Sequence, residues 1–139
     1  RIAEDIDGRE LPAIEGEIGL PKLSGGNPSP VELVRQLRRV MTDCVGVIRN
    51  GDGIAHALTE IARLEAEAGE TSLFVNMTTT ARLIAAAAFA REESRGGHFR
   101  SDFPEQREAW RHLTFITLAE ADRIAADALN RTRKASAQA

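Results

Sequence analysis

The chain has 139 residues, of which 42% are hydrophobic and 28% are charged, which is enough for one soluble domain with a modest core. Its formal net charge of -3 offers no electrostatic basis for binding nucleic acid. No uninterrupted apolar run is long enough to span a bilayer, and the first residues lack the pattern of a signal peptide.

A single cysteine, Cys44, excludes an internal disulfide bond. Cys44 falls on the apolar face of a predicted helix, so we interpret it as a small core residue rather than a nucleophile. A cytoplasmic location fits this composition. The chain starts at Arg1 rather than at a methionine, and we therefore expect it to be a piece of a longer protein.

The first 28 residues are predicted to lie outside the helical core. Residues 1–6 have the character of the last turn of a helix, and the segment up to Ser29 is rich in glycine and proline, which is typical of an irregular linker. We therefore divide the chain into residues 1–28 and a folded domain, residues 29–139. Spaced apolar residues suggest that the linker lies along a surface; they are Leu11, Ile14, Ile18 and Leu20.

The first helix is predicted to begin at Ser29, because Ser29-Pro30-Val31-Glu32 is a capping box with proline at the first helical position. Gly51 is expected to close it. Its core-facing stripe recurs at steps of three and four and comprises Leu33, Val34, Leu37, Val40, Met41, Cys44, Val45 and Ile48. The other sides form either a solvated basic face or a surface for an acidic partner or a neighbouring domain; their cations are Arg35, Arg38, Arg39 and Arg49.

Two further helices are predicted before residue 96. The second covers about residues 53–68, with Asp52 as its cap and Gly69 at its end. The third runs from about Ser72 to Arg95, and its run of four alanines allows another helix to pack closely. Its residues expected to face inward are Leu73, Phe74, Met77, Ala81, Ile84, Ala85, Ala88 and Phe89.

The paired glycines Gly96 and Gly97 are predicted to end the third helix. Arg91 and Arg95 would then lie in its last turn, where cations complement the helix dipole, and Glu92 would pair with Arg95. As a surface charge at a helix end, Arg95 is expected to contribute little to the stability of this chain.

An extended segment is predicted after the glycines. Its alternation would place Phe99 and Phe103 on one side and the polar residues His98, Arg100 and Asp102 on the other. A further helical segment would admit Pro104 in its first turn, and it would carry an apolar patch made of Trp110, Leu113, Phe115 and Ile116.

The last helix is predicted to open at a second capping box, Thr117-Leu118-Ala119-Glu120, and to fray from Arg131 to Ala139. One of its sides should carry Ile124, Ala125, Ala128 and Leu129. Four apolar helical stripes without strand alternation predict an all-α fold. We expect a helical bundle of three to four main helices, in a spectrin-repeat-like up-down arrangement, preceded by the irregular linker.

The polar stretch from Arg91 to Pro104 is the strongest candidate for a functional site. On its residues alone it is either a charged helix end with a loop pinned by two phenylalanines, or a preformed polar surface for another part of a protein or an anionic ligand. One histidine with scattered carboxylates lacks the spacing of metal ligands, and nothing in the chain has the pattern of a dinucleotide fingerprint or a catalytic triad. We therefore assign no catalytic, cofactor-binding or metal-binding residue, and we expect this chain alone to be inactive and to bind no flavin.

The same stretch resembles a known family. The run Glu93-Ser94-Arg95-Gly96-Gly97-His98-Phe99-Arg100-Ser101-Asp102-Phe103-Pro104 is similar to the ESRG-x-H-x-R-x-D-[FY]-P signature of the succinate dehydrogenase and fumarate reductase flavoprotein family. Trp110-Arg111-His112 resembles the W-x-[KR]-H that follows this signature. Within the family, the resemblance is greatest to the C-terminal helical domain of the L-aspartate oxidases, through Leu37-Arg38-Arg39-Val40-Met41 and Val45-Gly46-Val47-Ile48-Arg49.

The resemblance implies a function for the longer protein. L-Aspartate oxidases are FAD enzymes that oxidise L-aspartate to iminoaspartate in the first step of de novo NAD synthesis. In the family, the flavin and substrate sites lie on the flavin-binding and capping domains, which would be the partners of this chain. Residues 1–6 would then be the tail of the flavin domain, and quinolinate synthase is a candidate partner of the enzyme. The residues carried over as a docking surface toward the flavin domain are Glu93, Ser94, Arg95, His98, Arg100 and Asp102.

Two alternatives stay open at this point. The chain could be the matching domain of a succinate dehydrogenase or fumarate reductase flavoprotein subunit, whose partners include an iron–sulfur subunit. It could also be a free-standing helical interaction module.

Overall fold

The computed structural model describes residues 30–69 and 72–136, so the predicted linker, the cap at Ser29 and the last three residues lie outside the described part. The described chain is mostly helical, which confirms the prediction of a helical bundle. Its helices are α2 (Val31–Val45), α3 (Gly51–Ala68), α4 (Ser72–Ala90) and α5 (Leu118–Ser136). The shorter elements are the strands β1 (Ile48–Arg49) and β2 (Phe99–Arg100) and the 3₁₀ helix η1 (Glu108–Trp110).

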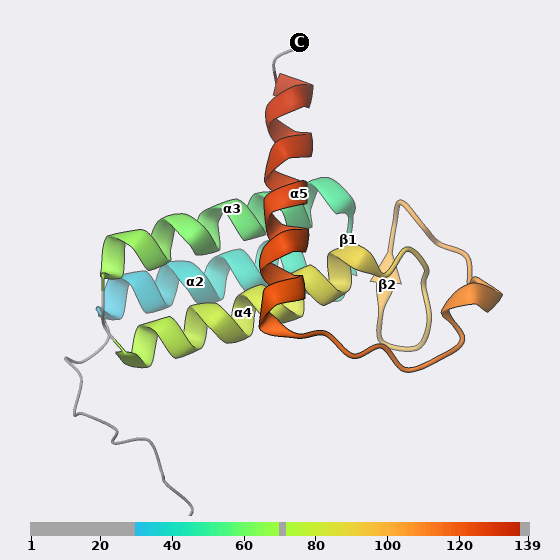
Figure 1. Cartoon of the computed structure of the whole chain (residues 1–139), viewed down its shortest axis with the longest axis horizontal. Helices are drawn as coiled ribbons and strands as arrows, with labels where there is room; N and C mark the ends of the chain where they lie inside the picture. The colour runs from blue at the N-terminus through green and yellow to red at the C-terminus, as the bar shows by residue number, and fades with distance from the viewer. Residues whose placement is uncertain (1–29, 70–71, 137–139) are drawn as a thin grey trace, which may run out of the picture.

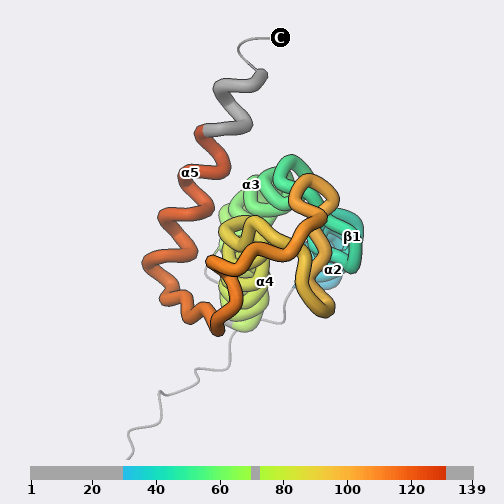
Figure 2. Tube along the Cα trace, turned by 90° about the vertical axis from the view of Figure 1, so that its right-hand side faces the viewer, coloured from blue at the N-terminus to red at the C-terminus, as the bar shows by residue number. Residues whose placement is uncertain are grey.

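Three of the helices form a bundle that the fourth crosses. Helices α2, α3 and α4 lie side by side with alternating directions, and α5 runs steeply across them (Figure 1). Viewed from the end at which α4 stops, α5 lies outside the group formed by the other three (Figure 2). It packs on α3 and α4. The predicted up-down order therefore holds for α2, α3 and α4, whereas α5 takes a crossing position.

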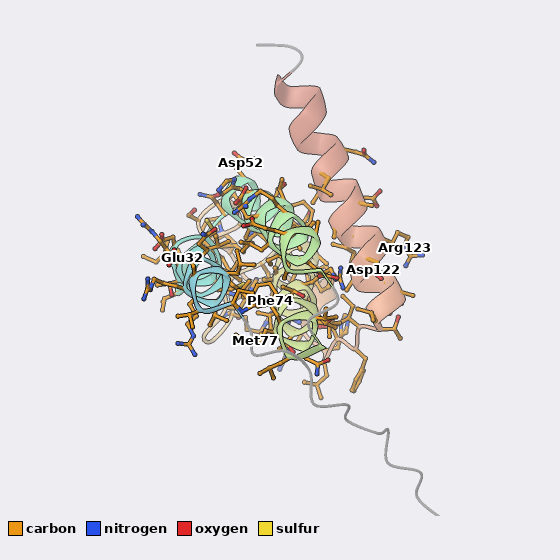
Figure 3. All side chains as sticks on the ribbon, turned by 90° about the vertical axis from the view of Figure 1, so that its left-hand side faces the viewer. Glu32, Asp52, Phe74, Met77, Asp122 and Arg123 are labelled. Carbon is orange, nitrogen blue, oxygen red and sulfur yellow. The ribbon has the colours of Figure 1, made fainter. Side chains whose placement is uncertain are left out.

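The core lies where α3 meets its neighbours. Ile54, Ile61 and Leu64 of α3 are fully buried, and each such aliphatic side chain contributes about 1.5–3 kcal/mol by leaving water. Phe74 of α4 is also fully buried and lies between α2, α3 and α4 (Figure 3). Helices α4 and α5 pack on each other, and both have small buried side chains; the buried alanines are Ala81, Ala85, Ala86 and Ala88 of α4 and Ala121, Ala125 and Ala128 of α5.

The first helix ends earlier than predicted, at Val45 rather than near Gly51. At Gly46 the chain turns into an extended conformation, and a Cβ atom there would lie 2.5 Å from the carbonyl oxygen of Thr42. Ile48 consequently belongs to β1 and is 70% exposed, so its assignment to the core was wrong.

The cap of the next helix also differs from the prediction. The side chain of Asn50 accepts a hydrogen bond from the Gly53 N–H at 2.8 Å, which makes Asn50 the N-cap of α3. Asp52, the predicted cap, lies in the first turn, where its charge still complements the helix dipole.

The third helix was predicted to reach Arg95, but α4 ends at Ala90. Its last carbonyl groups are bound by a side chain from further along the chain, as described below. Phe74 and Ala85 are buried as expected, whereas Leu73 and Ile84 are 58% and 50% exposed, so their inward assignment was wrong. They extend the apolar surface of α4 beyond the core.

The segment between β2 and α5, where a helix was predicted, is a loop. Its only regular element is η1, and the apolar residues Leu113 and Phe115 in it are 84% and 90% exposed. The predicted capping box is confirmed: Glu120 Oε2 accepts from the Thr117 N–H at 2.8 Å, and Thr117 Oγ1 accepts from the Glu120 N–H at 3.3 Å. Helix α5 continues to Ser136, past the residue at which fraying was predicted to start.

The segment Leu73–Ala90 of α4 is long and apolar enough to cross a membrane, judged by length and composition alone. The sequence does not show this window as an apolar run, because Asn76, three threonines and Arg82 interrupt it. Core helices of soluble proteins pass the same test. Since α4 packs against α2, α3 and α5, we interpret it as a core helix.

Replacing Gly46 by alanine should destabilise the domain, because the backbone would have to move away from the Thr42 carbonyl oxygen. We expect a loss of about 1–3 kcal/mol in the free energy of unfolding, measured by urea denaturation. Gly97→Ala is the matched control, since a Cβ atom there meets no described atom within 4 Å. Equal losses in the two variants would contradict this account of the turn.

Candidate functional site

The loops that follow α2 and α4 meet at one end of the bundle, where β1 and β2 pair in parallel (Figure 1). Figure 2 looks onto this end, with the loop that leads to α5 in front of the helices. We call this region, residues 46–51 and 91–112, the polar corner. It contains the whole stretch that the sequence analysis selected.

Glu93 lies at the centre of the polar corner and has no exposed surface. Its carboxylate accepts hydrogen bonds from the guanidinium groups of Arg91 and Arg95, the latter at 3.0 Å to each oxygen. The backbone N–H of Arg107 donates to Oε2 at 3.0 Å. The hydrogen bond from Arg95 is the main reason why the pKa of Glu93 falls from its ordinary value of 4.5 to about 2. Glu93 is therefore ionised at neutral pH.

The same two guanidinium groups also hold the loop that leads to η1. Arg91 donates to the carbonyl oxygen of Trp110, and its guanidinium carbon lies 5.7 Å from the centre of the Trp110 ring. Arg95 donates to the side chain of Gln106 at 3.1 Å and to the carbonyl oxygen of Arg107 at 3.2 Å. Arg95 is thus a bridge between a buried carboxylate and a loop, and the expectation that it is a weakly coupled charge at a helix end was wrong. Glu92 pairs with Arg107 at 3.3 Å instead of Arg95.

Arg100 is the second buried charge, with 2% of its side chain exposed. Its Nη1 donates to the carbonyl oxygens of Ala88 and Phe89 at 3.0 and 2.9 Å, which places a cation at the negative end of α4 and ends that helix. Its Nε and Nη2 form a bidentate pair with Asp102 at 2.8 and 2.7 Å. The predicted alternation is therefore reversed here, because Arg100 points inward and Phe99 is 40% exposed.

Asp102 connects this pair to the start of α3. Its Oδ2 accepts a hydrogen bond from the backbone N–H of Gly51 at 2.9 Å, at the positive end of the helix. The hydrogen bonds from Arg100 are the main reason why its pKa falls from 3.8 to about 2. A Cβ atom at position 51 would lie 3.0 Å from Oδ2, so glycine permits this close approach.

Ser94 and His98 fix the turn between the two buried charges. Ser94 Oγ accepts from the backbone N–H of Arg100 at 2.8 Å and donates to the carbonyl oxygen of Phe103 at 2.9 Å. Arg95 and His98 exchange backbone hydrogen bonds of 2.8 and 3.0 Å across Gly96, whose φ of 58° suits glycine. Gly96 thus forms this turn and does not end the helix as predicted.

The imidazole of His98 is also engaged within the chain. Its Nε2 donates to the carbonyl oxygen of Arg91 at 3.1 Å, which requires a proton on that nitrogen. Burial, and then the positive charges of Arg49 and Arg100, lower the pKa of His98. The ring is therefore neutral at neutral pH, and its role is to bind the backbone.

The structure brings all six residues of the predicted surface together, but at different depths. Glu93, Ser94 and Arg100 are buried, Arg95 and His98 are partly buried, and only Asp102 is exposed. The sequence analysis did not connect Arg91, Arg107 or Gly51 to this cluster. Arg107 and Gly51 contribute backbone N–H groups, which no side-chain pattern reveals, and Arg91 was placed inside a helix that stops one residue earlier.

The polar corner also carries a small apolar surface. Ile48 and Phe99 are paired residues of β1 and β2 and are 70% and 40% exposed, and the neighbouring Val47 is 79% exposed. Exposed apolar side chains beside a polar network are suited to contact with another protein surface.

The chemistry of the polar corner is that of a scaffold. The carboxylates of Glu93 and Asp102 are held by guanidinium groups and backbone N–H groups, and His98 donates to a carbonyl oxygen, so none of these three groups is placed to accept a proton from a substrate. Among the described residues no group of three or more His, Cys, Asp or Glu side chains could hold a metal ion.

The comparisons with known proteins point to one family. Residues 67–135 match the family described as fumarate reductase flavoprotein C-term. This range contains α4, the second part of the polar corner and nearly all of α5.

The relatives by sequence include several L-aspartate oxidases. The chain is 44% identical to that of Caulobacter vibrioides over 108 residues, which cover 76% of this chain and 20% of that protein. It is 40% identical to that of Rhodospirillum rubrum over 113 residues, which cover 71% of this chain and 40% of that protein. The chain therefore spans less than half the length of these relatives.

One solved structure with a similar fold is Mycobacterium smegmatis Sdh1 in complex with UQ1. Its TM-score is 0.53 at 33% identity, and the match covers 60% of this chain and 16% of that chain. The apo form of the Sdh1 complex gives the same TM-score and identity, with 66% of this chain and 18% of that chain covered.

Acid should unfold this domain through Glu93 and Asp102. Both have folded-state pKa values near 2, below their ordinary values of 4.5 and 3.8, so their ionised forms stabilise the folded state. This contribution is complete above pH 4.5 and is lost as the pH falls toward about 2. Circular dichroism should show the melting temperature falling over that range.

The variant Glu93→Gln should flatten this pH dependence, because it removes one of the two titrating groups. Glu67→Gln is the control, since Glu67 is an exposed carboxylate paired with Arg63 on the surface of α3. If the melting temperature of Glu93→Gln falls with pH as steeply as that of the unchanged chain, Glu93 is not responsible for the acid sensitivity.

Replacing Arg100 by methionine should cost about 3–5 kcal/mol in the free energy of unfolding, because Asp102 and two carbonyl groups of α4 lose their partner. Arg111→Met is the control, since Arg111 is 71% exposed and forms a surface pair with Glu108, worth at most about 1 kcal/mol. If urea denaturation gives the two variants the same free energy of unfolding, Arg100 does not connect the helix ends.

Proposed function

Because the chain belongs to the fumarate reductase flavoprotein C-terminal family, we propose that it is the C-terminal helical domain of an FAD-dependent L-aspartate oxidase. Such an enzyme would convert L-aspartate to iminoaspartate in the first step of de novo NAD synthesis. The observation that carries the proposal is the identity of 40–44% with L-aspartate oxidases over most of this chain.

The role of this domain in the enzyme is to brace the flavin-binding domain. The buried charges of Glu93 and Arg100 hold the polar corner in shape. The docking surface is then formed by the accessible parts of Arg95, His98 and Asp102, with the apolar residues beside them. Because the buried charges of Glu93 and Arg100 are already paired within the chain, they add little to the cost of bringing this surface against another domain.

The flavin and the substrate would bind to the flavin-binding and capping domains, and this domain alone would be inactive. In this proposal residues 1–28 are the tail of the flavin domain and a linker, and residues 29–139 form the helical domain. The enzyme would work in the cytoplasm, with quinolinate synthase as a further proposed partner.

A second candidate is the matching domain of a succinate dehydrogenase or fumarate reductase flavoprotein subunit. The likeness to the Sdh1 structures supports it. So does 31% identity over 106 residues to a fumarate reductase (CoM/CoB) subunit of Methanothermobacter marburgensis. The higher identity to the L-aspartate oxidases favours the first candidate.

The two candidates are separated by assaying the whole protein that carries this chain, supplied with FAD and an artificial electron acceptor. The proposal predicts reduction of the acceptor with L-aspartate and none above background with succinate. Turnover of succinate alone would establish the second candidate instead.

The docking role predicts that Ile48→Asp and Phe99→Asp weaken flavin retention and activity in the whole protein, because each places a charge on the apolar part of the proposed interface. Both side chains are exposed here, so the melting temperature of the 139-residue chain should hardly change. Ala66→Asp, on the exposed side of α3, adds the same charge elsewhere and should leave activity unchanged. Full flavin retention in the first two variants would exclude this surface as the interface.

A further inference from the structure

A groove of about 660 Å³ runs between α2 and α4. Figure 3 looks along these helices from the end at which both begin, with Met77 of α4 on the side facing α2 and α5 on the other side of α4. The groove lies away from the polar corner, along the first turns of α4. Its apolar lining comprises Leu37 and Met41 of α2 and Leu73, Met77, Ala81 and Ile84 of α4.

The groove is a second apolar face of α4, separate from the face that forms the core. The core face carries Phe74 and Ala85, which are fully buried, whereas the groove face includes Leu73 and Ile84, which are at least half exposed. The groove therefore offers exposed aliphatic side chains that an apolar segment could cover.

The edge of the groove is positively charged. Arg38 lines it and forms no ion pair with any described residue. Its neighbours on α2 already have partners, since Arg35 pairs with Glu32 at 2.8 Å and Arg39 with Asp43 at 3.6 Å. The groove therefore favours an occupant that combines aliphatic side chains with carboxylates.

We propose that the occupant is the segment of residues 7–28 of this same chain, which lies outside the described part of the structure. The segment has four acidic against two basic residues, and its apolar part carries three carboxylates and no cation. That part comprises Glu10, Leu11, Ile14, Glu15, Glu17, Ile18 and Leu20. Its composition is complementary to both the lining and the charged edge of the groove.

The position of the segment along the chain also suits this groove. It directly precedes Pro30 and α2, at the end of the bundle where α4 begins (Figure 1). The groove residues of α4 from Leu73 to Ile84 extend over about 16 Å of helix, and the ten residues after Leu20 can span up to about 33 Å. The tether also gives the segment an effective concentration in the millimolar range, so a weak contact is enough to fill the groove.

A nitroxide spin label at Gly16→Cys, in a Cys44→Ala background of the 139-residue chain, tests the proposal by NMR. Methyl signals of Met41, Met77 and Ile84 should lose most of their intensity through proximity to the label. Signals of Thr59, on the exposed side of α3, should not.

A matched pair of variants tests whether the groove itself holds the segment. Ile84→Asp should restore the signals of Met41 and Met77, because it places a carboxylate in the apolar lining opposite an acidic segment. Leu118→Asp is the control, since Leu118 is exposed to a similar extent, 45% against 50%, and lies at the start of α5 outside the groove.

Three results would overturn the proposal. The methyl signals of the groove could keep their intensity. The loss of signal intensity could instead be spread evenly over the surface or fall on another face. It could also arise only when the label and the isotope are on different molecules, which would assign the groove to a second copy. The measurement uses this chain alone and no substrate, so its outcome is independent of the proposed oxidase activity.

Discussion

A carboxylate can be buried only when its charge is compensated, and this constraint organises the end of the bundle around Glu93. Compensation comes from Arg91 and Arg95 on its own side of the loop and from the backbone of Arg107 on the other. Because the same guanidinium groups bind carbonyl oxygens of residues 107–112, the loop has to follow the path that satisfies them. The buried charge of Glu93 thus sets the route from α4 to α5.

The pair formed by Arg100 and Asp102 extends this network to the helices. Its cation binds the last carbonyl groups of α4 and its anion binds the first N–H of α3, so each charge lies at the helix end whose dipole it complements. The end of α4 and the start of α3 are thus joined through one bidentate contact. The result is a corner whose buried charges, Glu93 and Arg100, are paired within the chain, as the proposed docking role requires.

Much of the fold could be predicted from local patterns. The helices follow from apolar residues at steps of three and four, and the start of α5 follows from the reciprocal contacts of Thr117 and Glu120. The stretch chosen as the candidate site is the one in which the buried charges gather. Local patterns failed where a group distant in the sequence decides the structure. Arg100 ends α4 from ten residues beyond Ala90, and position 51 is a glycine because its backbone lies close to the side chain of Asp102. Which side chains are buried could not be predicted either. The alternation after Gly97 is compatible with a buried Phe99 as well as with a buried Arg100, and only the hydrogen bonds to the carbonyl groups of α4 decide between them.

The buried ion pairs should already be formed in this chain alone, before any partner binds. Native-state hydrogen exchange measures this directly, through the backbone N–H of Arg107 bound to Glu93 and that of Arg100 bound to Ser94. The account predicts that both exchange only when the whole domain unfolds, as slowly as the core amides of Ile61 and Leu64. Exchange of these two amides through local opening, orders of magnitude faster than the core, would show that the polar corner is not preformed.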